Sequence, residues 1–289
     1  MRIPVVIAVL AAASIASAAP PAPAAPKTDP REALVRALTA GRTPQEQAQN
    51  LAALAWPASG PRDSAIAEAA REELENFGSH AMVALREAIN YVRPEYAEEV
   101  VRTTIGAQRF SEVGRGREYL PILLDALWVS PRAAKELAIR GLLGERPSLA
   151  VQPMIDSALE DPALVPLVVE SLGTLRYEQA RFYLERILME GPPPLRPVAA
   201  SSLAQIGGAA LKPLKSALKA PSKETRLLAV HALLPAATEY ELGSLYEYME
   251  QHGDDDPVLT QAIKASAVTI EKAIAARDAS EAAASPKDF

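Results

Sequence analysis

The chain has 289 residues, no cysteine and a formal net charge of −6, so it can form neither disulfides nor thiolate metal sites, and an acidic surface disfavours nucleic acid as a partner. Hydrophobic residues make up 49% of the chain but aromatic residues only 5%. Because Ala, Leu, Ile and Val supply most of the apolar mass, this composition favours closely packed helices over a β-sandwich.

The first 18 residues have the features of a secretory signal peptide. Arg2 precedes an apolar run over residues 3–13, and residues 16–18 (ASA) offer a small-residue cleavage site. We therefore expect residues 1–18 to be removed and the protein to be exported, either to the periplasm or into the medium. The run is too short to cross a bilayer and no later segment is longer, so we expect no membrane span. A retained anchor is the alternative interpretation.

The composition divides the rest of the chain into three segments. Residues 19–30 (APPAPAAPKTDP) are rich in Pro and Ala and predict an extended tether. Residues 31–277 have a helical pattern, punctuated by Pro or Gly and without strand alternation, and predict one all-α domain. Residues 278–289 are small and charged and predict a disordered tail.

Internal repetition is the most informative feature of this domain. Residues 77–89 and 206–218 share their apolar positions, a Gly and several small residues. In addition, leucines late in successive helical segments recur about every 30 residues, at Leu142, Leu172, Leu203 and Leu233. Such a period fits two short helices joined by a tight turn, and since one pair cannot bury its own apolar face, the pairs must stack.

The repeat predicts about six helical hairpins between capping helices. The hairpins are expected near residues 61–92, 94–128, 131–160, 161–191, 193–220 and 222–251. A helical pair over 31–56 and a final helix over about 257–277 are expected to cap the two ends of the stack.

Residues 195–214 resemble a HEAT repeat of the short type also found in phycobilisome lyases. The family pattern has an Arg early in the first helix, then Ala and Leu, a Gly turn, and an Ala/Leu second helix. Arg196 and Arg226 match the Arg, and Lys135 occupies the equivalent place, whereas Val165 departs from the pattern. The resemblance implies a right-handed α-solenoid whose second helices line the concave surface.

No catalytic, cofactor or metal site is expected. The three histidines, His80, His231 and His252, fall in different repeats, so they cannot converge on a metal ion. Residues 253–257 (GDDDP) lack the alternating ligands and distal Glu of a calcium loop and are better explained as the cap of the last helix. No nucleophile elbow, phosphate loop or dinucleotide fingerprint is present.

An insertion over residues 106–120 (GAQRFSEVGRGREYL) is the first candidate binding surface. Insertions in repeat proteins emerge as loops on one face, which is often the binding face. Here Arg109, Phe110, Arg115 and Arg117 would suit an acidic or aromatic partner. The alternative is a long connection without a function.

A stripe of lysines is the second candidate. Lys212, Lys215 and Lys219 stand at i, i+3 and i+7 on one second helix, and the resemblance implies that they face the concave groove. The next second helix presents Tyr240 and Glu247 as further candidates. The alternative is that the neighbouring charges merely offset one another.

These features favour an exported HEAT-repeat scaffold that binds a protein or peptide through its concave face. Two alternatives stay open. The resemblance also admits an enzyme of HEAT-like lyase or glycosylase type, although such relatives act on cytoplasmic substrates, which conflicts with a signal peptide. A binder of anionic envelope glycans could use the lysine stripe.

Overall fold

The protein is built of α-helices joined by short 3-10 turns, as the composition predicts. The computed structural model describes residues 29–59, 62–110, 114–253 and 257–284, and these contain no strand. The predicted signal peptide and most of the predicted tether therefore lie outside the described residues. The tether ends earlier than expected, because Asp29 caps the first helix through its side chain and Pro30 takes the first helical position.

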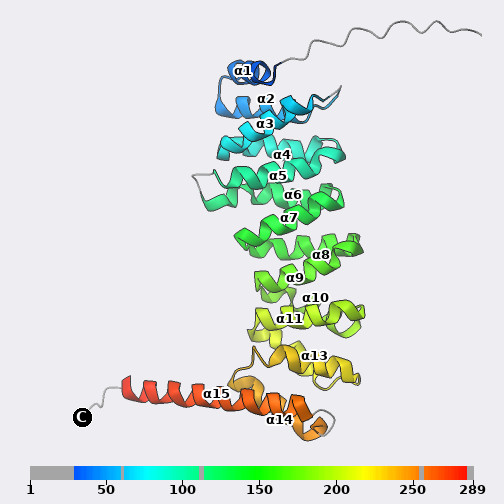
Figure 1. Ribbon diagram of the computed structural model, residues 1–289, viewed down its shortest axis with the longest axis vertical. Helices are drawn as coiled ribbons and strands as arrows, with labels where there is room; N and C mark the ends of the chain where they lie inside the picture. The colour runs from blue at the N-terminus through cyan, green and yellow to red at the C-terminus, as the bar shows by residue number, and fades with distance from the viewer. Residues whose placement is uncertain (1–28, 60–61, 111–113, 254–256, 285–289) are drawn as a thin grey trace, which may run out of the picture.

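Each range predicted for a helical pair contains two successive helices, and none of these helices extends more than one residue beyond its range (Figure 1). The first helices of the pairs are α1 (Pro30–Ala40), α3 (Ser64–Asn76), α5 (Ala97–Gln108), α7 (Arg132–Glu145), α9 (Val165–Leu175), α11 (Arg196–Ile206) and α13 (Lys223–Leu233). The second helices are α2 (Pro44–Ala55), α4 (Met82–Tyr91), α6 (Leu120–Val129), α8 (Val151–Glu160), α10 (Arg181–Glu190), α12 (Leu211–Ala217) and α14 (Glu239–His252). The chain then enters α15 (Pro257–Ala284).

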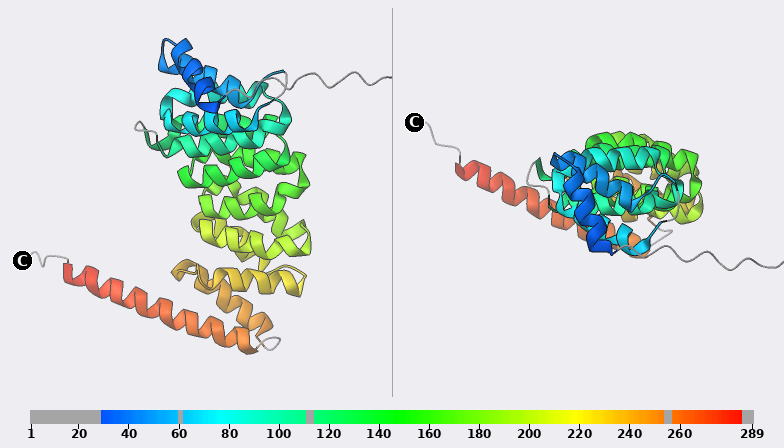
Figure 2. Two further views of the ribbon diagram at one scale, coloured as in Figure 1. Left: turned by 45° about the horizontal axis from the view of Figure 1, so that its top comes forward. Right: turned by 90° about the horizontal axis from the view of Figure 1, so that it is seen from above.

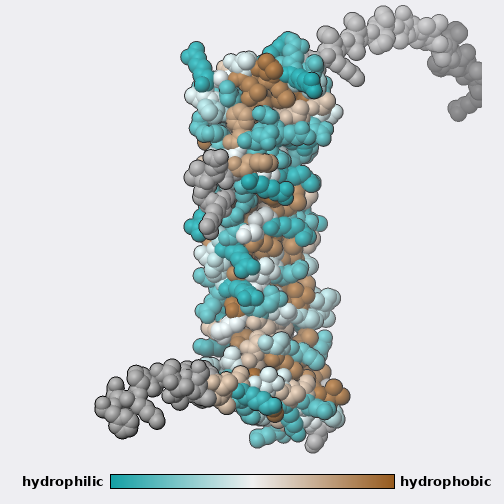
Figure 3. Space-filling view, turned by 60° about the vertical axis from the view of Figure 1, so that its left-hand side comes forward, coloured by the Kyte–Doolittle hydropathy of each residue, from teal (hydrophilic) through white to brown (hydrophobic). Residues whose placement is uncertain are grey.

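The hairpins stack in series to form an elongated column with two layers (Figures 1 and 2). First helices pack on first helices from α3 to α13, and second helices pack on one another from α2 to α8 and again from α10 to α12. The recurring leucines hold the stack together, since Leu142, Leu172, Leu203 and Leu233 are all fully buried. Figure 3 shows one face of the column, where hydrophobic residues are interspersed with hydrophilic ones along its length.

Small residues allow α9 and α11 to approach closely. A β-carbon at Gly173 would lie 2.6 Å from Ser202 Oγ and 2.8 Å from Ser202 Cα. The Ser202 hydroxyl is buried and donates to the Val169 carbonyl at 2.8 Å, so it links the two helices directly. A similar bond joins the Ser157 hydroxyl to the Leu127 carbonyl at 3.1 Å between α8 and α6.

Both glycine and arginine take the left-handed backbone conformation in the turns between helices. Gly207 and Gly208 between α11 and α12 have φ of 73° and 52°, as expected of the Gly turn. At the ends of α7 and α9, however, the left-handed positions are held by Arg146 and Arg176. A side chain costs about 1 kcal/mol in this conformation, so the turns do not depend on Gly alone.

The last helix differs from the cap that the sequence predicts. It packs on α14 through Leu259, Ile263 and Ala267, and Glu271 accepts a hydrogen bond of 2.9 Å from the Tyr246 hydroxyl. It then runs past residue 277 and leaves the side of the column (Figures 1 and 2). Alanine is frequent in this part, which explains why the helix continues into the predicted tail. Residues 285–289 lie outside the described residues.

Across the described part of the chain, no helix is both long enough and apolar enough to cross a bilayer.

Candidate functional site

Lys212 and Lys215 of the lysine stripe lie on α12, Lys219 lies two residues beyond the end of this helix, and acidic residues of α14 lie opposite. Lys215 Nζ lies 3.3 Å from Glu241 Oε1, and Lys219 Nζ lies 2.8 Å from Glu247 Oε1. Two of the three lysines are thus neutralised by the neighbouring helix, as the alternative interpretation had it. Lys212 is exposed and makes no ion pair or hydrogen bond with any other described residue.

Glu241 holds the ion pair with Lys215 in place. Its side chain is buried and its Oε2 accepts hydrogen bonds from Thr238 N at 3.1 Å and Thr238 Oγ1 at 2.6 Å, which closes a capping box at the start of α14. Burial raises the pKa of Glu241, but the Thr238 hydrogen bonds and Lys215 outweigh it and hold the pKa below its usual value. The carboxylate therefore stays charged and fixes Lys215 at the wall of the neighbouring groove.

A groove of about 990 Å³ lies beside this pair. Its walls come from three places that are far apart in sequence: the turn between α11 and α12, the turn between α13 and α14, and the second half of α15. The apolar lining is Ala204, Ala209, Leu211, Ala236, Ala237, Ile270, Ala273 and Ile274. Lys212, Lys215, Tyr240 and Glu241 also line the groove, and Tyr240 is 77% exposed. The structure thus joins Tyr240 to the lysine stripe, while Lys219 and Glu247 are not among the lining residues.

The contribution of α15 was not foreseen in the sequence. Its apolar stripe runs through Leu259, Ile263, Ala267, Ile270 and Ile274 at helical spacing. The first three are buried against α14, whereas Ile270 and Ile274 are only half-buried and face the groove. The sequence does show that the apolar stripe continues through Ile270 and Ile274. It does not show that the contact with α14 ends before these residues.

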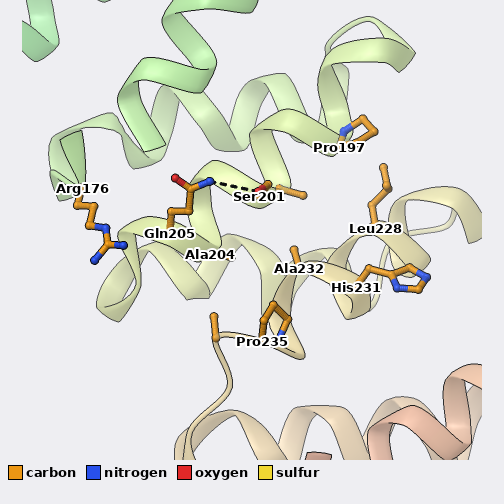
Figure 4. A pocket seen from close by; sticks show the side chains of 11 residues that line it. Arg176, Pro197, Ser201, Ala204, Gln205, Leu228, His231, Ala232 and Pro235 are labelled. Carbon is orange, nitrogen blue, oxygen red and sulfur yellow. Dashed lines mark hydrogen bonds between the residues drawn. The ribbon is translucent and has the colours of Figure 1, made fainter. Parts of the chain in front are cut away.

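A second, smaller pocket of about 550 Å³ lies on the layer of first helices (Figure 4). It is lined mainly by small and apolar residues of α11 and α13, with Arg176, Gln205 and His231 at its edges. The Gln205 side chain donates to Ser201 Oγ at 3.4 Å, and the His231 ring points away from that hydroxyl. The pocket therefore holds no paired nucleophile and base.

The insertion is placed well away from the groove, since α7 to α11 lie between them in the stack (Figure 1). Its first residues belong to α5, and a 3-10 helix over Gly114–Tyr119 leads into α6. Arg109 and Phe110 are exposed at the end of α5, and Arg117 is also exposed. Residues 111–113 and the side chain of Arg115 lie outside the described residues.

Tyr119 anchors the end of the insertion. Its side chain is fully buried, and burial with Glu118 nearby raises its pKa to about 12. Its hydroxyl has no hydrogen-bond partner in the described structure. The phenol therefore stays neutral and acts as a packing residue that fixes where α6 begins.

Within the described ranges, no group of three or more His, Asp or Glu side chains could hold a metal ion.

Comparison with known proteins adds little. No family model matches the chain, and no curated protein matches it. The crystal structure of an engineered protein aligns with 85% of this chain and 98% of its own, at 16% sequence identity and a TM-score of 0.27. A likeness of this size establishes neither a shared family nor a shared function.

Proposed function

We propose that the protein is a non-catalytic scaffold, an α-solenoid of HEAT-type repeats, that binds a segment of another polypeptide in the groove beside α15. The serial stack of hairpins and the Arg196 to Leu214 repeat support the solenoid. The signal-peptide pattern of residues 1–18 supports export to the periplasm or the medium. The observation that carries the binding proposal is the groove itself.

The groove has the composition of a polypeptide-binding site. Ligand sites are concave and mostly apolar, with a few polar groups that fix orientation. Here small and branched apolar side chains form the walls, Tyr240 supplies an exposed aromatic, and Lys212 supplies a cation without a partner among the described residues. A bound segment would place apolar side chains against the walls between α12 and α15 and beside Tyr240, and a carboxylate on Lys212.

The charges of the stripe favour a polypeptide over an anionic glycan. Glu241 and Glu247 already neutralise Lys215 and Lys219, which leaves Lys212 as the one lysine of the stripe available to an anion. A repeating anionic polymer gains most from several cations in a row. One cation beside an apolar wall suits a single carboxylate better.

Selection of peptides from a random 12-residue display library on the immobilised full chain tests this proposal. We expect enriched peptides to combine apolar residues with Asp, Glu or a free carboxyl terminus. The Ile274→Asp change should weaken their binding by about tenfold or more, because it places a charge on the apolar wall.

Val268→Asp is the matched control. Val268 is on the same helix and 48% exposed but does not line the groove, so its replacement should leave the affinity unchanged. Peptides that bind both variants as well as they bind the unaltered protein would rule out the groove as the site.

A further inference from the structure

The groove beside α15 adjoins the pocket on the layer of first helices. Ala204, near the end of α11, and Ala236, in the connection that follows α13, line both cavities. The two cavities therefore meet at two small, half-buried side chains, over which a bound chain can pass from one to the other. We call the two cavities together the extended groove.

The pocket lengthens the apolar lining of the groove. Pro197 of α11, Leu228 of α13 and Pro235 belong to its wall (Figure 4). Alanine is its most frequent lining residue, so the backbone of a bound chain can approach the helices closely. A concave and mostly apolar surface of this kind is typical of a binding site.

Arg176 supplies a cation at the edge of the pocket (Figure 4). It is exposed at the end of α9, and its side chain makes no ion pair or hydrogen bond with the described residues. Glu178, two residues further on, instead accepts a hydrogen bond of 3.3 Å from Ala209 N. None of the described residues that line the pocket is Asp or Glu. Within the described structure, the guanidinium therefore has no counter-ion.

Each part of the extended groove thus offers one cation to a ligand. Beside α15 this cation is Lys212, because Lys215 pairs with Glu241 there and Glu239 is not free either. In the pocket it is Arg176. Two single cations in different parts of an apolar surface suit two carboxylates on one segment, whereas a polyanion gains most from cations in a row.

The course of the extended groove favours an extended chain over a helix. It leads from the space between α12 and α15, past the ends of α11 and α13, to the layer of first helices. A straight α-helix about 10 Å wide cannot follow this bend. Since α9 and α13 both pack on α11, their axes lie about 20 Å apart at most. Twelve extended residues span about 40 Å, which is enough to occupy both parts.

We propose that the extended groove binds an extended segment of a partner polypeptide with two acidic groups, one on Lys212 and one on Arg176, and apolar residues between them. This inference rests on the proposed function, because it lengthens the same binding site. Arg176 is then a specificity-determining residue, since a segment with a single acidic group leaves one of the two cations without a partner.

The probe is the set of peptides selected from the 12-residue display library on the full chain. We expect the enriched peptides to carry two acidic groups with apolar residues between them. Arg176→Asn should weaken their binding about fivefold, because an exposed ion pair is lost. Asn tolerates the left-handed backbone conformation of Arg176, so circular dichroism of the variant should match that of the unaltered protein.

Arg146→Asn is the matched control. Arg146 has the same left-handed conformation at the end of α7, is exposed and lines neither cavity, so its replacement should leave the affinity unchanged. A selected peptide in which an amide replaces the acidic group that meets Arg176 should bind the unaltered protein and the Arg176→Asn variant equally, because neither combination retains the ion pair.

The inference and the proposed function fail in different ways. If Ile274→Asp weakens binding but Arg176→Asn does not, the groove beside α15 binds the peptide and the extension to Arg176 is wrong. If neither change weakens binding, the proposed function itself is wrong. Equal losses from Arg176→Asn and Arg146→Asn would show a general effect of charge and would overturn the inference alone.

Discussion

Replacing Gly173 by alanine is expected to lower the free energy of unfolding by about 2 kcal/mol, although alanine is the better helix former. The added methyl group would lie 2.8 Å from Ser202 Cα, which is backbone and cannot move without shifting α11. The cost should therefore exceed the gain of about 1 kcal/mol that the same change brings at an unobstructed helical position. Chemical denaturation of the full chain measures the difference.

Gly144→Ala provides the comparison. Gly144 lies near the end of α7, and nothing comes within 4 Å of a β-carbon built there. This change should leave the free energy of unfolding unaltered or raise it by up to about 1 kcal/mol. If the two variants were equally stable, α9 and α11 would not approach each other as closely as the structure has them.

Replacing Glu99 by alanine is the second change with a large expected effect, about 2 kcal/mol of lost stability. Glu99 on α5 accepts hydrogen bonds from Trp56 Nε1 at 3.2 Å and from Arg62 at 3.1 Å, and lies 3.5 Å from Arg71. These partners come from the C-cap of α2, from the connection that follows it and from α3. Removing the carboxylate would leave two partly buried guanidinium groups without their anion.

The adjacent Glu98 gives a matched control. The structure pairs it with Arg102 on the same helix, and both side chains are largely exposed. Exposed ion pairs contribute little to stability, so Glu98→Ala should change the free energy of unfolding by less than about 0.5 kcal/mol. Equal losses from the two substitutions would mean that the Glu99 cluster does not tie the first hairpins together.

The same cluster predicts a loss of stability in acid. Burial raises the pKa of Glu99, but Arg62, Arg71 and Trp56 outweigh it and hold the pKa below the ordinary value of 4.5. A carboxylate with a lowered folded-state pKa stabilises fully above its unfolded value, and this contribution is lost as the pH falls through the folded value. Stability should therefore decline below about pH 4.5, and Glu99→Gln should make that decline shallower. If the stability of the variant fell with pH as steeply as that of the unaltered protein, groups other than Glu99 would cause the decline.

The sequence was sufficient to place the helical hairpins. Each predicted range contains two α-helices whose ends fall close to the expected residues, because Pro and Gly mark the turns and the buried leucines recur once per hairpin. The prediction of a Gly turn was right at Gly207, yet Arg146 and Arg176 have a positive φ at the ends of two other helices. Propensity alone does not identify a left-handed arginine, since the surrounding packing imposes it.

The candidate site could be predicted only in part. Helical spacing put three lysines on one helix, but α12 ends at Ala217, so only Lys212 and Lys215 lie on it and Lys219 follows in the turn. Whether their charges are free depends on where α14 lies across from α12. The groove needs α15 as its third wall, and its direction is set by docking on α14 rather than by its own pattern.

Hydrogen exchange of the full chain with and without a library-selected peptide tests the central claim most directly. If the groove is the binding site, exchange should slow in residues 236–241 and in the second half of α15, around Ile270 and Ile274. Protection confined to the insertion around Arg109 and Phe110 would contradict it.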